Sequence, residues 1–365
     1  MKINRTQLFA YRLPLCRPLA VRDGSTDYRE GFLILMVSDS DAVGWGETAP
    51  LAGFSNENID DALRQLRTFL PSLDQKDLPT NLVQLDGAFG EWLGRYNLFP
   101  SVQCGIEMAT LNLLAHHKGC QLCQLLTTDP ASTVAVNALI DSADDAIAET
   151  HQAMRNSYKA VKLKVGRRSV KKDVELVRDV CEALENRATL RLDANRAWNL
   201  KQAIEFAESV ENCVIEYIEE PLADVQELSS LLSRTDMPVA LDESLMNIDP
   251  GNLPDIPGIA AIILKPTMLG GFEKAAQFAR TANKHMIKVV VSSTFESTVG
   301  IAALSQLAAA FGTPGTPVGL DTGRWFKHDV TTERILIDGA TISIEQAATA
   351  ASKLDNSCLS EVKLG

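Results

Sequence analysis

Five short apolar runs in this chain each end in a charged side chain, and each is followed by a loop and a helical pattern. The charged residues are Lys164, Asp193, Glu219, Asp242 and Lys265, so successive positions differ by 29, 26, 23 and 23 residues. One strand, a loop and a crossover helix of a parallel βα repeat need about that length. Because the C-terminal ends of parallel strands meet at one face, the pattern predicts a (β/α)-barrel with its active site at that face.

The rest of the chain is long enough for a second folding unit, because a barrel takes roughly 200–250 residues and the chain has 365. We expect an α/β protein: a (β/α)-barrel of modified TIM type over residues 128–328, preceded by an α+β capping domain over residues 1–127. The segment 329–365, with a hairpin over 335–344 around Asp338-Gly339, is expected to return to the cap and complete it.

Individual elements are predicted from hydrophobic periodicity. In the cap, strands are expected at 7–15 and 31–37, separated by a polar loop over 17–30, and helices at 58–70 and 101–117. Further barrel strands are expected at 134–140, 288–293 and, as a short eighth, 317–320. Barrel helices are expected at 170–184, 201–209, 222–233, 272–284 and 299–311.

Residues 44–55 combine glycines and prolines, which argue against a regular element, with three large apolar side chains, Trp45, Leu51 and Phe54. Such side chains are unfavourable in water. The segment is therefore either a loop folded over its own small core or a lid over the mouth of the barrel.

Composition excludes several classes of function. A net charge of −12 and a pI near 5.0 give no basic surface for nucleic acid. Seven cysteines do not form a paired disulfide framework and favour a reducing, cytoplasmic location, and Cys120 and Cys123 are interpreted as core packing rather than a zinc or redox pair. No apolar run approaches the ~20 residues of a membrane span, and the N-terminus lacks a signal peptide. We expect a soluble protein without a membrane or nucleic-acid partner; its oligomeric state is not predicted.

Strand parity brings the charged residues together. Lys162 and Lys164 lie two residues apart and so point to the same side of their strand; alone, they would also suit an exposed edge strand. Asp193, Glu219 and Asp242 would meet at the barrel mouth, where three carboxylates repel unless a cation joins them. Oxygen ligands select a hard ion, which predicts Mg²⁺ or Mn²⁺. Each acid alone could instead be a helix N-cap, and Glu220 could replace Glu219 as a ligand.

These motifs resemble a known family. The Lys-x-Lys pair at 162–164, Asp-Ala-Asn at 193–195, Glu-Glu-Pro at 219–221 and Leu-Asp-Glu-Ser at 241–244, followed by Lys265, are similar to the enolase superfamily in its muconate-lactonizing branch. Within that branch, residues 44–55, 191–198, 264–271 and 292–297 resemble the o-succinylbenzoate synthase family of menaquinone biosynthesis. The resemblance covers essentially the whole chain.

The resemblance implies a site and a reaction. Asp193, Glu219 and Asp242 would bind Mg²⁺, Lys164 would be the acid/base, Lys265 would face it across the substrate, and Lys162 would support Lys164. The substrate would be a small carboxylate, 2-succinyl-6-hydroxy-2,4-cyclohexadiene-1-carboxylate, dehydrated to 2-succinylbenzoate. Cap loops 17–30 and 48–55 would close over it. Contacts from the barrel are expected from Arg191, Asn195, Ser292, Ser293 and Thr294.

Three alternatives stay open at this point. Relatives that racemise N-acylamino acids or epimerise dipeptides use two lysines on opposite faces, and both lysines are present here. Lys265 could also be a Schiff-base lysine of an aldolase-type barrel. Finally, the chain could be a metal-binding barrel without catalytic turnover.

Overall fold

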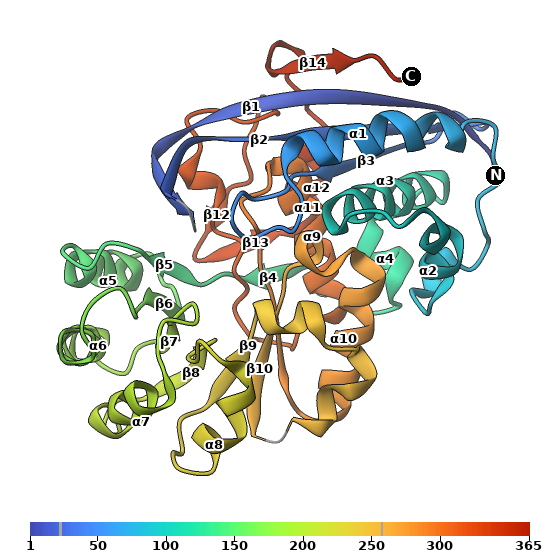
Figure 1. Ribbon diagram of the computed structural model, residues 1–365. Coiled ribbons are helices and arrows are strands. Elements are labelled where there is room, and N and C mark those ends of the chain that lie inside the picture. Colours follow the sequence, from blue (N-terminus) through green and yellow to red (C-terminus); the bar gives the residue numbers. More distant parts are fainter. Residues whose placement is uncertain (22–23, 257) are drawn as a thin grey trace.

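The computed structural model describes residues 1–21, 24–256 and 258–365. The N-terminal part contains an antiparallel sheet in the order β14-β1-β2-β3. Its strands are β1 (Ile3–Val21), β2 (Gly24–Ser38), β3 (Val43–Thr48) and β14 (Leu359–Val362). The sheet lies at the top of Figure 1, where the first and last segments of the chain run side by side.

The prediction of a polar loop over 17–30 is wrong for most of these residues. Strands β1 and β2 continue as a two-stranded ribbon in which Leu19 pairs with Thr26 and Val21 pairs with Gly24. The ribbon shifts register between Pro14 and Leu19. Its backbone hydrogen bonds are made between its own two strands, so polar side chains are tolerated on it, while Leu19 packs into a hydrophobic cluster. Residues 22–23 lie outside the described part of the chain.

The predicted irregular segment 44–55 is also partly wrong, because its first residues form β3. Helix α3 (Pro100–His117) lies so close to this strand that a Cβ on Gly46 would come within 2.0 Å of the Gly105 carbonyl oxygen. Glycine is therefore needed for the close approach of strand and helix and does not interrupt the strand. The cap helices are α1 (Ile59–Phe69), α2 (Ala88–Leu93), α3 (Pro100–His117) and α4 (Leu122–Leu126).

The second part of the chain is a parallel sheet of seven strands in sequential order, β5 to β11. Their bounds are β5 (Ala138–Ile140), β6 (Ala160–Lys164), β7 (Thr189–Asp193), β8 (Ile215–Glu219), β9 (Val239–Leu241), β10 (Ile259–Leu264) and β11 (Lys288–Val291). The expected eighth strand is reduced to two bridges, Val318 to Val136 and Gly319 to Ser292. These bridges connect β11 back to the segment before β5, so the barrel closes through an extended segment.

Helices cover the outside of the barrel, as predicted from the βα period. They are α5 (Ala146–Arg155), α6 (Val170–Leu184), α7 (Leu200–Ser209), α8 (Leu228–Leu232), α10 (Phe272–Lys284) and α11 (Thr298–Phe311). The short helix α9 (Pro266–Leu269) lies at the C-terminal end of β10. The helix expected at 222–233 is shorter than predicted. The Asp224 side chain accepts a hydrogen bond from the Gln226 N–H, so the element begins there as a 3₁₀ turn that leads into α8.

The C-terminal segment connects both parts. The expected hairpin is present as β12 (Ile337–Asp338) and β13 (Thr341–Ser343), but β13 pairs with β4 (Thr133–Ala135) rather than with the cap. The predicted strand 134–140 is thereby divided between β4 and β5. After α12 (Ile344–Ala351), strand β14 returns to pair with β1. The predicted fold class, a barrel with an α+β cap completed by the C-terminal tail, is confirmed.

One continuous hydrophobic core connects cap and barrel. The same cluster contains Leu8 and Met108 from the cap and Phe272 and Leu304 from barrel helices. Cys123 packs in this cluster with Cys120 at its edge, and all seven cysteines are free thiols. Among the residues described, no helix combines the length and apolarity needed to cross a membrane.

Candidate active site

Strand register sets a row of charged residues at the C-terminal ends of the barrel strands. In the parallel pairing, Lys164 on β6 is opposite Asp193 on β7, and Asp193 is opposite Glu219 on β8. Asp242 directly follows β9 and Lys265 directly follows β10. The predicted lysines and carboxylates therefore reach one edge of the barrel because their strands are paired in register.

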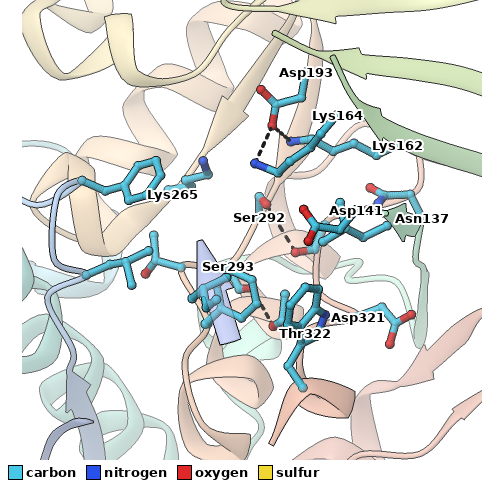
Figure 2. Close-up of a pocket in the computed structure, with 18 of the residues that line it drawn as sticks. Asn137, Asp141, Lys162, Lys164, Asp193, Lys265, Ser292, Ser293, Asp321 and Thr322 are labelled. Atoms are coloured by element: carbon cyan, nitrogen blue, oxygen red, sulfur yellow. Dashed lines mark hydrogen bonds and ion pairs between the residues drawn. The ribbon is translucent and has the colours of Figure 1, made fainter. Parts of the chain in front are cut away.

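These side chains form a cluster held by two groups of ion pairs, one around Asp193 and Glu219 and one between Lys265 and Asp242. Figure 2 shows the pairs made by Asp193. The Lys162 ammonium lies 2.5 Å from Glu219 Oε2 and 3.1 Å from Asp193 Oδ2. Lys164 Nζ lies farther away, 3.5 Å from the same Asp193 oxygen. Lys265 is paired with Asp242 and points toward the other two lysines from the opposite wall of the cavity. Among the three amines, Lys164 has the longest ion pair and is thus the least constrained by its partner.

Burial and mutual repulsion perturb the acids. Burial raises the pKa of Glu219 to about 7 against the opposing effect of Lys162, and neighbouring Asp193 and Asp242 contribute to the rise. Burial also raises the pKa of Glu243 to about 7, with Asp242 adding to it. For Asp193 burial acts in the same direction, but Lys162 and Lys164 outweigh it and hold its pKa below the ordinary value. When Glu243 is counted, the site brings four acids together with three lysines.

The donor set fits a hard divalent cation. In the described ranges, no three acidic, cysteine or histidine side chains already have the spacing of a bound metal ion, since Lys162 lies between two of the carboxylates. Asp193, Glu219 and Asp242 are nevertheless all buried oxygen donors on adjacent strands. Glu243 Oε2, next to them, has no hydrogen-bond partner among the described residues. Buried oxygen donors from several acids are the chemistry that Mg²⁺ binds.

A cavity opens beside this cluster and is covered by the cap. Leu51 and Phe54 from the segment after β3, and Leu19 from the β1–β2 ribbon, line it together with the barrel residues. Both cap segments named as lids in the sequence analysis therefore lie against the cavity. The described residues that line it are Leu19, Leu51, Phe54, Asn137, Leu139, Asp141, Lys162, Lys164, Arg167, Asp193, Lys265, Met268, Ser292, Ser293, Thr294, Phe295, Gly319, Asp321, Thr322 and Trp325.

The expected substrate contacts divide into two groups. Ser292, Ser293 and Thr294 line the cavity. Arg191 does not: its buried guanidinium donates to Glu216 Oε2 at 2.7 Å and to the Pro317 carbonyl at 2.6 Å. Arg191 shares a strand face with Asp193 but lies two residues earlier, so its side chain reaches toward the N-terminal end of the barrel.

Asn195 also differs from the expectation. It is exposed, it is not among the lining residues, and its backbone N–H donates to Asp193 Oδ1 at 3.1 Å in a left-handed turn with φ of 46°. The backbone of Asn195 therefore orients one of the cluster carboxylates while its side chain points to solvent.

Arg29 was missed by the sequence analysis because it lies in the supposed loop. Its buried guanidinium donates to the Pro50 carbonyl at 2.6 Å and to the carbonyls of Thr294 and Phe295, both at 3.2 Å. It therefore ties the lid segment to the loop that follows β11. A signal for this role was available in the sequence, because Arg29 lies shortly before the apolar part of β2.

Comparison with known proteins agrees with this geometry. Residues 145–348 match a family described as "Enolase C-terminal domain-like", and residues 3–113 match "MenC, N-terminal domain". The chain is 31% identical to an o-succinylbenzoate synthase of Pasteurella multocida (strain Pm70), over 88% of this chain and 89% of that protein. It is 33% identical to the chloroplastic protein PHYLLO of Arabidopsis thaliana over 90% of this chain, but spans only 21% of the length of that protein.

Solved structures share the fold. A dipeptide epimerase from Cytophaga hutchinsonii, complexed with Mg and the dipeptide D-Ala-L-Val, superimposes with a TM-score of 0.85 at 22% identity over 100% of both chains. At this identity the similarity establishes the architecture. The two family matches and the 31% identity over nearly the full length also establish the family. This chain therefore belongs to the enolase superfamily and, within it, to the family of the o-succinylbenzoate synthases.

Proposed function

We propose that the protein is an o-succinylbenzoate synthase that dehydrates 2-succinyl-6-hydroxy-2,4-cyclohexadiene-1-carboxylate to 2-succinylbenzoate, with the place in menaquinone biosynthesis that this activity implies. The observation that carries the proposal is the pair of lysines, Lys164 and Lys265, on opposite walls of one cavity beside a row of buried carboxylates. Its specificity for this reaction is supported by the match of residues 3–113 and by the identity to o-succinylbenzoate synthases.

The chemistry requires removal of a weakly acidic proton next to a carboxylate. Lys164, as the free amine, would take this proton from the ring carbon and leave an enediolate. The resulting ammonium would then give its proton to the departing hydroxyl group, so the C–H and C–O bonds break, water leaves and the ring becomes aromatic. Use of one amine for both transfers fits the 3.5 Å ion pair of Lys164, which is the longest ion pair among the three lysines.

Other residues would hold the reactants in place. When bound by Asp193, Glu219 and Asp242, Mg²⁺ would supply positive charge next to the substrate carboxylate. Lys265 would add a second positive charge from the opposite wall, and Lys162 would keep Asp193 and Glu219 in position. The apolar cap residues Leu51 and Phe54 would reduce access of water to the enediolate.

The direct test is conversion of the cyclohexadiene substrate by purified protein with Mg²⁺, followed as loss of the diene absorbance. We expect conversion by the unaltered protein and none above background by Lys164→Ala. Lys159→Ala is the matched control, because this exposed lysine lies just before the same strand and should leave the rate unchanged. Conversion by Lys164→Ala at the normal rate would contradict the acid/base role.

N-acylamino acid racemase or dipeptide epimerase activity is the second candidate. It is favoured by the two opposed lysines and by the fold shared with a dipeptide epimerase. Racemisation uses both amines as bases, so incubation of an N-succinylamino acid or a dipeptide in D₂O should exchange its α-hydrogen. Exchange without any conversion of the cyclohexadiene would favour this reading over dehydration.

An aldolase-type Schiff base at Lys265 is disfavoured by its surroundings. Burial alone would lower the pKa of Lys265, but Asp242 and Glu243 outweigh burial and raise it. A nucleophilic amine must be unprotonated, and its pKa is normally lowered for that purpose. Borohydride reduction in the presence of a carbonyl substrate should therefore give no covalent adduct, and turnover with Mg²⁺ would exclude a purely metal-binding role.

A further inference from the structure

The inference drawn here rests on the proposed function and concerns the second carboxylate of the substrate. The substrate carries one carboxylate on the ring and another at the end of the succinyl group. The lysines of the cluster, and the Mg²⁺ that its carboxylates would hold, would bind the ring carboxylate, next to the carbon that loses its proton. The succinyl carboxylate must be placed elsewhere in the cavity, and an anion in a largely apolar cavity needs a cationic or hydrogen-bond-donating partner.

Among the described residues that line the cavity, one cationic side chain lies outside the cluster. Its cationic side chains are Lys162, Lys164, Lys265 and Arg167. The three lysines are ion-paired within the cluster. Arg167 is also ion-paired, but outside the cluster and through one nitrogen only, with Nη2 at 3.2 Å from Asp141 Oδ1. A guanidinium has five N–H donors in a planar fork, so most of them stay available for a carboxylate.

The hydroxyl groups of the cavity are already engaged. Ser293 Oγ and Thr322 Oγ1 are hydrogen-bonded to each other at 2.7 Å, and Ser292 Oγ donates to the Gly319 carbonyl at 3.3 Å. These groups can contact a ligand, but none supplies a positive charge. The succinyl carboxylate would therefore find its electrostatic partner on the Arg167 side of the cavity.

The loop that carries Arg167 is held in place before any ligand binds. Gly166 has φ of +81°, and a Cβ there would come within 2.4 Å of Ala197 Cβ, so the turn is tightly packed. The Gly166 N–H donates to Asp173 Oδ2 at 2.8 Å, and Arg168 Nε lies 3.3 Å from Asp173 Oδ1. Asp173 therefore draws Arg168 toward α6, whereas Arg167 lines the cavity with a side chain that is 48% exposed.

We propose that Arg167 is a specificity-determining residue that binds the succinyl carboxylate and thereby selects dicarboxylate substrates. It lies three positions after Lys164 on the same strand-to-helix connection, so the catalytic amine and the anchor for the far end of the substrate are fixed by one rigid turn. Asp141, its ion-pair partner, keeps the guanidinium at the rim. On binding, a substrate carboxylate would share or replace that hydrogen bond.

The test compares a dicarboxylate with an analogue in which the succinyl carboxylate is a primary amide. For Arg167→Met we expect KM for the dicarboxylate substrate to rise about tenfold, with kcat within about twofold, because the contact is made equally in ground and transition states. Arg167→Met should also lose the preference for dicarboxylate over amide. Arg167→Lys should keep part of it. Lys171→Met, which removes the same charge from an exposed position on α6, should behave like the unaltered protein.

Binding measurements separate this proposal from the proposed function. Calorimetric titration with 2-succinylbenzoate and with its succinyl-amide analogue needs no turnover, so it can be read even if the protein fails to convert the cyclohexadiene. The unaltered protein should bind the dicarboxylate about tenfold more tightly, and Arg167→Met should bind both alike. Equal affinities in the unaltered protein, a preference that survives in Arg167→Met, or the same loss in Lys171→Met would overturn the role of Arg167.

Discussion

Glu47 is a cap residue whose carboxylate is completely buried against a barrel helix. It accepts hydrogen bonds from the Ser297 N–H at 2.9 Å, the Ser297 hydroxyl at 2.6 Å and the Gly300 N–H at 2.9 Å, and also from the Tyr11 hydroxyl. Ser297 is the N-cap of α11. A carboxylate from the cap therefore satisfies the first N–H groups of a barrel helix, in the place where an anion is favoured.

Glu47 should make stability depend on pH. Burial raises its pKa to about 7 in spite of the Ser297 hydrogen bonds, whereas a glutamate in an unfolded chain titrates near about 4.3. Between these values the folded chain holds the extra proton, so this residue lowers the free energy of unfolding as pH rises from about 4.5 to 7. Glu47→Gln removes the titration, so the stability of the unaltered protein relative to this variant should fall by about 3 kcal/mol over that window.

Urea unfolding at pH 5 and pH 8 measures this difference. Glu175→Gln, a change at an exposed position on α6, is the control and should leave the pH dependence as it is. Tyr11, Glu296 and Cys104 are titratable groups near Glu47, and Arg29 lies near Tyr11. All of them stay in both proteins. If the free energy of unfolding of the unaltered protein relative to Glu47→Gln were the same at pH 5 and pH 8, Glu47 would not change its protonation over this range, and the prediction would be wrong.

At the residue scale, the sequence predicts which side of a strand a residue faces better than it predicts how far along the barrel axis its side chain lies. The two-residue period placed Lys162, Lys164 and Asp193 together correctly, because register carries the period from strand to strand. The same period put Arg191 with them, although its partners Glu216 and Pro317 hold it below the cavity. Depth depends on long-range partners, and these are not encoded in the local pattern.

At the scale of elements, the close contact between β3 and α3 holds the cap sheet against a cap helix. Gly44 and Gly46 alternate with Trp45 and Glu47, so the glycines face the helix while Glu47 reaches the start of α11. A Cβ at Gly44 would lie 2.1 Å from the Ala109 carbonyl oxygen. Because these neighbours are backbone atoms of a helix, they cannot rotate away.

Gly46→Ala should therefore destabilise the fold. The new methyl group would meet the Gly105 carbonyl at 2.0 Å and the Ala109 nitrogen at 2.6 Å, and separating β3 from α3 should cost about 1–3 kcal/mol or more. Thermal and urea denaturation would measure the loss. Gly94→Ala is the matched control, since a Cβ there meets nothing within 4 Å and its αR backbone suits alanine, so its stability should stay equal or rise slightly. Equal stability of both variants would contradict the close-packing argument.

Contacts with other segments explain which elements the sequence predicted poorly. Helices α6, α10 and α11 follow from local periodicity, and their observed bounds agree with the expected 170–184, 272–284 and 299–311 within one residue. Strand β3 and the ends of β1 and β2 were interpreted as loops because glycine and polar residues are poor local strand signals. Their strand structure depends on partners elsewhere, which are β2 for β3 and the opposite ribbon strand for residues 19–21 and 24–26.

At the scale of the whole molecule, binding of the proposed metal ion should increase the free energy of unfolding. A ligand that binds only the folded chain raises the free energy of unfolding by about 2.7 kcal/mol at one hundred times its Kd. Mg²⁺ should give this increase, and EDTA should remove it. Asp242→Asn should lose most of the increase, whereas Asp179→Asn, at an exposed position on α6, should retain it. A full Mg²⁺ effect in Asp242→Asn would contradict its assignment as a ligand.

Cap and barrel also depend on each other through reciprocal helix caps. Glu107 on α3 accepts from the Glu273 N–H at 2.9 Å at the start of α10. Glu273 in turn accepts from the N–H groups of Phe89 at 3.0 Å and Gly90 at 2.8 Å in α2. Each part thus satisfies backbone donors of the other, in addition to the hydrophobic core that they share. Although the proposed boundaries, 1–127 and 128–328, describe two architectures, this arrangement favours one cooperative unit.

We therefore expect cap and barrel to unfold together. Two variants that each keep a single tryptophan, Trp92 in the cap helix α2 or Trp198 after barrel strand β7, with the other tryptophans changed to phenylalanine, report on the two parts separately. In each variant, the urea transition followed by tryptophan fluorescence should coincide with the transition followed by far-UV circular dichroism. Residues 1–127 expressed alone should show no cooperative transition, because Glu107 and the apolar face of α3 would lose their barrel partners. A Trp92 transition at clearly lower urea than the loss of helix signal would instead mean that the cap opens as an independent domain.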